Sequence, residues 1–411
     1  MKPPSNVTGV NARRPRLSRR DLLVAMTVGS VVLDSVTSRT RACGVARLDI
    51  QSEAAARDYL KGLLLTRDDV DAWLAGTAFP FSRYDAELGY LHIDRDFKEG
   101  IGGAICRYRY DRLDARRTIA CADQPCRINT YGNSFTSCEQ VSDGETWQEF
   151  LAAHLGEPVR NYGIGGYSVY QAYLRMLREQ RRAPARYVIF NVFDDDHYRN
   201  LHGWQRIRFG VNRKATNPTI PYLVVNPQTG EFIERPNPCP TPESLYQLCD
   251  LDAVCRLFQH DFVLKSRLAR DARRSQGQPV PASDYDDAEF NGHALFATQR
   301  IIEKVAAFAA AHERHILYVL SYSPHSIQRY LEKGDRFDRP LVDFFEERRL
   351  PYVDLLKAHA ADYERYHVAP AEYLAQYFIG HYNPLGNFFC AFAIKDKLVE
   401  MLDPKPPAYA R

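Results

Sequence analysis

The sequence contains nine cysteines in 411 residues but has no pair of cysteines separated by two residues. Such pairs are typical of structural zinc sites, so the sequence speaks against a bound metal. It also lacks a hydrophobic run long enough to cross a membrane. The run from Leu22 to Leu33 has twelve mostly apolar residues, whereas a spanning helix needs about 20. No internal repeat or low-complexity segment is evident.

A charge excess of one sign is also lacking. The formal net charge is +3, from 54 basic and 51 acidic residues. Residues 1–43 hold eight of the basic and two of the acidic residues, which leaves 46 positive and 49 negative charges in the remainder. Without residues 1–43 the chain is therefore slightly acidic. This charge gives no reason to expect a nucleic acid partner or stable membrane attachment.

Residues 1–43 have the pattern of an export signal, with basic residues followed by a short apolar run. The stretch "SRRDLL" (Ser18 to Leu23) resembles the twin-arginine export motif. An amphipathic N-terminal arm with two adjacent arginines is the alternative. We expect export by the twin-arginine route to a periplasmic or secreted location.

Cysteine content fits an oxidising compartment. If Cys43 is removed with the signal, eight cysteines remain, and an even number is compatible with disulfides. Cys121 and Cys126 are close enough in sequence to staple a loop, whereas Cys138 and Cys390 lie in apolar patterns typical of buried free thiols. A further link is expected within the cluster Cys239, Cys249 and Cys255.

From about residue 125, strand-like and helix-like segments alternate. Strands are expected at 126–132, 158–164, 185–193, 315–323 and 350–356, and helices at 144–156, 168–180, 295–312, 339–349 and 385–402. This alternation predicts an α/β fold, a three-layer α/β/α sandwich with a parallel sheet. We place a small N-terminal accessory module at 44–124, with a hairpin around "KEGIGGA", and the main domain at 125–411 with a long insertion at about 203–292. A second hairpin, "PYLVVNPQTGEFIE", is expected within that insertion.

Four stretches fall where strands of this sheet end, and ligands of such folds bind beyond the carboxyl ends of the strands. Taken alone, each would be an ordinary turn. The stretches are "YGNSFT" (131–136), "NYGIGG" (161–166), "FDDD" (193–196) and "GHYNPLGN" (380–387).

In this order the stretches resemble the conserved blocks of the SGNH (GDSL-type) hydrolases, a family of esterases and lipases. The resemblance covers roughly residues 127–202 and 294–403 and implies a flavodoxin-like sandwich and no cofactor. It implies that Ser134 is the nucleophile, that His381 is the base, and that the N–H groups of Ser134 and Gly166 bind the oxyanion. A serine hydroxyl needs such a base within hydrogen-bond reach, and the oxyanion needs fixed donors.

Two positions depart from the family pattern. The aspartate expected three residues before the histidine is Phe378 here, so His381 needs a backbone carbonyl, Asp354 or Glu372 behind it, or it acts in a Ser–His dyad. In the third block an aspartate, Asp194 or Asp195, replaces the family's asparagine, and a carboxylate would repel the oxyanion. The side-chain amide of Asn191, or of Asn133 in the first block, would then complete the oxyanion hole.

The sequence thus favours an exported serine esterase that hydrolyses a short acyl ester, such as an acetyl ester, of a carbohydrate or another small molecule. Two alternatives remain open: an extracytoplasmic O-acyltransferase on the same fold, and a binding protein that has lost catalysis, for which Phe378 and the "FDDD" block speak.

Overall fold

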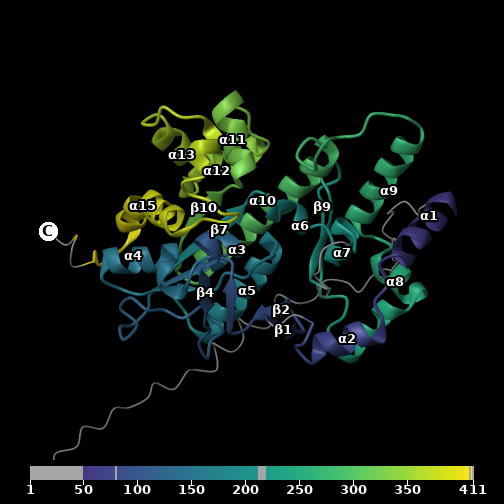
Figure 1. The fold of residues 1–411 in the computed structure, drawn as a ribbon, viewed down its shortest axis with the longest axis horizontal. Helices are drawn as coiled ribbons and strands as arrows, with labels where there is room; N and C mark the ends of the chain where they lie inside the picture. The colour runs from purple at the N-terminus through teal and green to yellow at the C-terminus, as the bar shows by residue number, and fades with distance from the viewer. Residues whose placement is uncertain (1–49, 79–80, 212–218, 407–408, 410–411) are drawn as a thin grey trace, which may run out of the picture. The chain divides into compact units, whose positions relative to one another are not determined.

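A parallel sheet lies at the centre of the computed structural model, which describes residues 50–411 except 79–80, 212–218, 407–408 and 410–411 (Figure 1). In this described part the sheet has the strand order β11-β10-β7-β5-β6, and all neighbouring strands are parallel. The strands are β5 (Ile128–Tyr131), β6 (Val159–Asn161), β7 (Tyr187–Phe193), β10 (His315–Ser321) and β11 (Tyr352–Asp354). In chain order this is the 2-1-3-4-5 arrangement of flavodoxin-like folds, and it reverses between β5 and β7.

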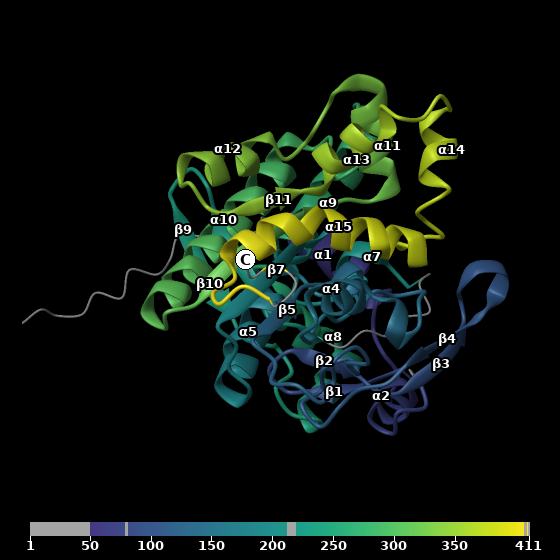
Figure 2. The same ribbon diagram turned by 90° about the vertical axis from the view of Figure 1, so that its left-hand side faces the viewer.

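Helices cover both faces of the sheet. On one face α4 (Trp147–Leu155) contacts α15 (Pro384–Met401), and on the other α5 (Val169–Arg182) contacts α10 (Ala288–Ala311) (Figure 2). The expected three-layer α/β/α fold class is therefore confirmed. The other α-helices of this part are α3 (Ser134–Ser137), α6 (Asp196–Arg199), α11 (Pro324–Lys333), α12 (Arg339–Glu347), α13 (Leu355–Tyr363) and α14 (Pro370–Leu374).

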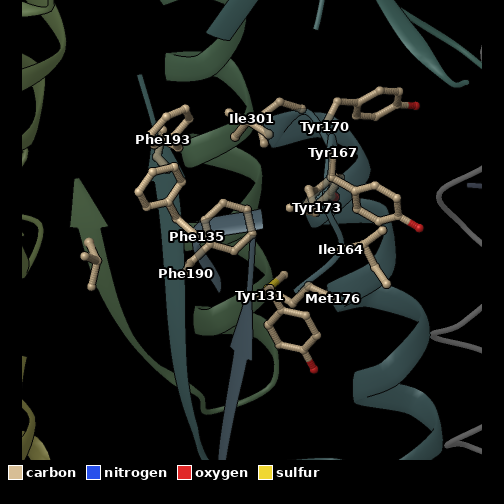
Figure 3. Packing of buried hydrophobic residues seen from close by; sticks show 14 of the residues in the cluster. Tyr131, Phe135, Ile164, Tyr167, Tyr170, Tyr173, Met176, Phe190, Phe193 and Ile301 are labelled. Carbon is tan, nitrogen blue, oxygen red and sulfur yellow. The ribbon is translucent and has the colours of Figure 1, made fainter. Parts of the chain in front are cut away.

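Local sequence explains where these elements begin and end. All seven residues of β7 are buried, as a strand covered on both faces requires. Thr146 caps the start of α4, and Gly156, with φ at 73°, ends it. Figure 3 shows buried side chains that β5, β7 and α5 contribute to the core, among them Tyr131, Phe190 and Met176.

Residues before 125 form short elements of their own. These are α1 (Ile50–Lys61), α2 (Arg67–Leu74), β1 (Ser82–Asp85), β2 (Gly89–His92), β3 (Arg95–Lys98) and β4 (Ile105–Tyr108). Strands β3 and β4 pair antiparallel across the glycine-rich turn, so the expected hairpin is confirmed.

The segment 203–292 packs against these early helices. It contains α7 (Gln205–Phe209), β8 (Tyr222–Asn226), β9 (Glu231–Arg235), α8 (Leu251–Phe258) and α9 (Phe262–Ser275), and β8 and β9 form the second expected hairpin. Helix α1 contacts both α8 and α9. Helix α1 also bonds to α7, where the Ile207 carbonyl accepts from the Tyr59 hydroxyl at 2.8 Å. The described residues belong to one compact unit.

The cysteines differ from the disulfide prediction. All eight cysteines in the described part of the chain are free thiols. The Cys121 thiol faces the Ala152 carbonyl, whereas the Cys126 thiol faces the carbonyls of Ile128 and Pro158, so the two sulfurs point to different partners. The predicted staple is therefore absent here, while Cys138 and Cys390 are buried thiols as expected.

The predicted export signal, residues 1–43, lies outside the described residues. A search of the helices that the structure does describe finds none with the length and apolar character of a membrane span.

Candidate active site

Ser134 lies on a tight turn between β5 and α3 (Ser134–Ser137), at the edge where the strand order reverses. Gly132 makes this turn possible, because a Cβ there would lie 2.2 Å from Thr136 Oγ1. Asn133 then caps α3, since its Oδ1 accepts from the Phe135 N–H at 2.9 Å. Its Nδ2 donates to Asp196 Oδ1 at 2.9 Å. Helix α3 is a single turn, and it presents the serine at its first position.

His381 comes from the other end of the chain, in the loop that precedes α15. Its Nε2 is 2.9 Å from Ser134 Oγ, which is hydrogen-bond distance. Its own backbone N–H donates to Gln140 Oε1 at 2.6 Å, and its ring centroid is 4.9 Å from that of Phe135. The structure therefore brings together the two residues for which the sequence predicts nucleophile and base.

The acids predicted to orient His381 lie elsewhere. Asp354 caps α13 through the Leu356 N–H at 3.0 Å and pairs with Arg336 at 2.7 Å. Glu372 is exposed on α14. At the family's aspartate position, Phe378 stacks on Tyr382 with ring centroids 4.4 Å apart. Among the residues that the structure describes, none accepts a hydrogen bond from His381 Nδ1.

The glycine loop after β6 runs beside the nucleophile turn. The Ile164 N–H donates to the Gly132 carbonyl at 3.1 Å, and a Cβ on Gly163 would lie 2.1 Å from the Ser137 nitrogen. Gly166 has φ at 81°, and a Cβ there would lie 2.6 Å from the Tyr90 hydroxyl. Neither the Ser134 N–H nor the Gly166 N–H donates to another residue that the structure describes.

The side-chain amides proposed for the oxyanion hole have other partners. Strand β7 continues to Phe193, so Asn191 lies inside the strand rather than at its end. Its Nδ2 donates to Thr136 Oγ1 at 3.0 Å and its Oδ1 accepts from Ser321 Oγ at 2.8 Å. Together with the Asn133–Asp196 bond, this gives both side-chain amides structural partners within the fold.

The aspartates of the third block serve structural contacts. Asp194 accepts from Ser326 Oγ at 2.6 Å and Ser323 Oγ at 2.7 Å, and burial raises its pKa to about 6. Burial also raises the pKa of Asp195, but the charges of Arg208 and Arg199 outweigh this and lower the pKa to about 2. Each carboxylate therefore stabilises its own neighbours, and neither points at His381.

Sequence reasoning missed a charged residue next to the histidine. Glu139 Oε2 is 3.9 Å from His381 Nε2, and Glu139 Oε1 is 3.5 Å from a guanidinium nitrogen of Arg95. A Cβ on Gly165 would lie 1.9 Å from Glu139 Oε1, so the carboxylate lies directly against the glycine loop. Glu139 belongs to none of the four blocks, and the only sequence signal is its position five residues after Ser134.

Burial favours the neutral form of His381. Burial lowers its pKa below the ordinary value of 6.5, against the opposing effect of the Glu139 and Glu99 carboxylates. A neutral imidazole can accept the serine proton at neutral pH. Within the described ranges, no three His, Cys, Asp or Glu side chains are grouped so as to hold a metal ion.

The comparison with known proteins finds matches among solved structures but none by sequence. No protein-family model and no curated protein match the sequence. The acetyl xylan esterase AlAXEase is 12% identical with a TM-score of 0.35, and the match covers 67% of this chain and 100% of that one. A variant of Axe2, an acetyl-xylooligosaccharide esterase from Geobacillus, is 11% identical with a TM-score of 0.36, covering 68% and 95%. A GDSL-like lipase from Bacteroides thetaiotaomicron is 12% identical with a TM-score of 0.30, covering 68% and 90%.

Proposed function

We propose that the protein is an exported serine esterase that hydrolyses a short acyl ester, such as an acetyl ester of a carbohydrate or another small molecule. The observation that carries this proposal is the 2.9 Å contact between Ser134 Oγ and His381 Nε2, at the sheet edge where ligands of this fold bind. The two free backbone N–H groups at Ser134 and Gly166 support it, because acyl transfer needs donors for the oxyanion.

In the proposed reaction, Ser134 Oγ attacks the ester carbonyl carbon while its proton moves to His381 Nε2. The alcohol then leaves with that proton, which gives the acyl-serine. His381 next takes a proton from water, the hydroxide attacks the acyl group, and the acid leaves as Ser134 regains its hydrogen. No carboxylate behind the histidine is required for this proton balance, because that residue orients and stabilises the base without reacting itself.

Buried aromatic side chains pack around Phe135, the residue after the nucleophile. Phe135 stacks on Phe193 with ring centroids 4.2 Å apart, and its ring centroid is 5.5 Å from that of Tyr382.

Two measurements on the purified protein test the proposed function. One compares the hydrolysis of p-nitrophenyl acetate, butyrate and octanoate, and the other is labelling of Ser134 by a fluorophosphonate. Failure of the probe to label Ser134 would leave the binding-protein alternative. Faster formation of an acylated sugar than of free acid, in excess monosaccharide, would identify an acyltransferase.

The pH dependence follows from the lowered pKa of His381. Only the neutral imidazole accepts the serine proton, so kcat/KM should rise with pH and level off above that pKa. We expect one ascending limb with a midpoint below pH 6.5 and a plateau from pH 7 to 8 for p-nitrophenyl acetate. A midpoint above pH 7 would contradict the assignment of His381 as the base.

The export proposal has its own test, which concerns residues outside the described part. Replacing Arg19 and Arg20 together with lysine should leave the full-length protein in the cytoplasm, because the paired arginines define the twin-arginine signal. Fractionation of expressing bacteria measures this. The matched control replaces the neighbouring pair Arg13 and Arg14 with lysine and should be exported normally, whereas equal export of both variants would exclude this route.

A further inference from the structure

The loop between Cys138 and Val141, directly after the nucleophile turn, has a strained backbone. Cys138 has φ at 58° and Gln140 has φ at 70°. Residues other than glycine rarely adopt this left-handed region, and they keep it only where the surroundings hold them there. The two strained residues lie on either side of Glu139.

A buried arginine from the segment before residue 125 holds this loop. Arg116 is 1% exposed, and its guanidinium donates to the carbonyls of Ser137, Cys138 at 2.6 Å and Val141 at 2.5 Å. Its Nε donates to Asp143 at 3.0 Å. One side chain therefore holds the Ser137 carbonyl at the end of α3 and two carbonyls of the loop, and the Asp143 carboxylate compensates its charge.

The fixed loop presents two side chains to His381. Gln140 Oε1 accepts from the His381 backbone N–H at 2.6 Å, and the Gln140 N–H donates to the Tyr108 hydroxyl at 2.6 Å. Glu139 places Oε2 3.9 Å from His381 Nε2, the nitrogen that also faces Ser134. The side chains of His381 and Glu139 are 26% and 23% exposed, so both border the solvent-accessible site.

Arg95 fixes the direction of the Glu139 carboxylate. Its side chain is 5% exposed and its guanidinium lies over the Tyr108 ring, 4.1 Å from the centroid. Because Arg95 faces Oε1 at 3.5 Å, the other oxygen of Glu139 is left to face the histidine. Arg95 also offsets part of the negative charge that would otherwise oppose an oxyanion next to the glycine loop.

We propose that Glu139 is the charge partner of His381 and takes over, from the Nε2 side, the role of the acid that this chain lacks at Phe378. The inference rests on the proposed function. When His381 takes the proton of Ser134, the positive ring lies about 4 Å from a carboxylate, which stabilises it more strongly in a partly buried site than in water. The proton continues to the leaving alcohol, and Glu139 neither gains nor loses one. Glu139 therefore acts through His381, by stabilising the positive charge of its ring, and does not itself react.

Glu139→Gln, which keeps the shape and removes the charge, tests this proposal. The exposed Glu332→Gln in α11 is the matched control. We expect kcat for p-nitrophenyl acetate to fall about 10- to 100-fold in Glu139→Gln, with KM within twofold and an unchanged melting temperature. Because Glu139 raises the pKa of His381, the ascending pH limb should move to lower pH, and Glu139→Asp should restore part of kcat.

A second readout does not depend on activity. The His381 ring can be titrated by NMR in both proteins, and its pKa should be lower in Glu139→Gln than in Glu332→Gln. An unchanged titration and kcat would overturn the role of Glu139 while leaving a labelled, active Ser134 intact. A rise in KM alone would also overturn it, because that result assigns Glu139 to substrate binding. Lack of probe labelling in the unaltered protein would instead reject the esterase proposal itself.

Discussion

Ser134→Ala is expected to lower kcat for p-nitrophenyl acetate by at least about 10³-fold and to abolish labelling by a fluorophosphonate. The serine hydroxyl lies within hydrogen-bond distance of His381 Nε2, at 2.9 Å, and without it no acyl-enzyme can form. Residual hydrolysis of the activated ester would then come from His381 and the oxyanion donors alone. Steady-state kinetics and mass spectrometry of the labelled protein measure the two effects.

Ser137→Ala is the matched control for this change. Ser137 is a buried serine in the same short helix, three residues after Ser134. Its replacement should keep kcat within about threefold of the unaltered protein. If Ser134→Ala were as active as Ser137→Ala, the nucleophile would lie elsewhere and the proposed mechanism would be rejected.

Arg116→Met is expected to have the largest effect on stability. The methionine fills similar space but leaves the Asp143 carboxylate, whose side chain is 9% exposed, without its partner. The Ser137 carbonyl and two carbonyls of the 138–141 loop lose their donor as well. Removing one member of a buried ion pair typically costs about 3–5 kcal/mol. Urea denaturation followed by circular dichroism should show a loss of this size in the free energy of unfolding.

Arg83→Met supplies the comparison at the surface. Arg83 pairs with Asp114 at 2.8 Å, but its side chain is 48% exposed. Such a pair contributes about 0–1 kcal/mol, so the variant should unfold almost like the unaltered protein. Equal losses in the two variants would show that Arg116 does not anchor the loop as its contacts indicate.

The sheet could be predicted from the sequence because its signals are local. The continuous apolar run that became β7 and the glycine that ends α4 each reflect the preference of a few neighbouring residues. The block around His381 was expected at a strand end but lies in the loop before α15, after no strand of the sheet, whereas the blocks around Ser134 and Gly166 do follow β5 and β6. Once strand order 2-1-3-4-5 is formed, the ends of these strands necessarily meet at one edge.

The contacts around the base could not be predicted, because they depend on distant segments and on unusual backbone conformations. Cys138 and Gln140 carry no sequence signal for a left-handed φ, which glycine or asparagine would give. Arginine is expected at the surface, so the burial of Arg116 becomes visible only when its carbonyl partners are in place. Asn191 lies inside β7, and the contact of its amide with Thr136 depends on how the segment after β5 packs against this strand, which no local pattern indicates.

The site is built from residues on both sides of residue 125, so a truncated or recombined chain keeps it only if both parts are present. The arginines that hold Glu139 and its loop, Arg95 and Arg116, are encoded before residue 125, whereas Ser134, Glu139 and His381 are encoded after it. A gene fragment beginning at residue 125 would keep the sheet and the nucleophile but lose both guanidinium groups. If residues 125–411 are joined to a different leading segment, that segment must supply equivalents of the two arginines. We therefore expect the two parts of the chain to be inherited together.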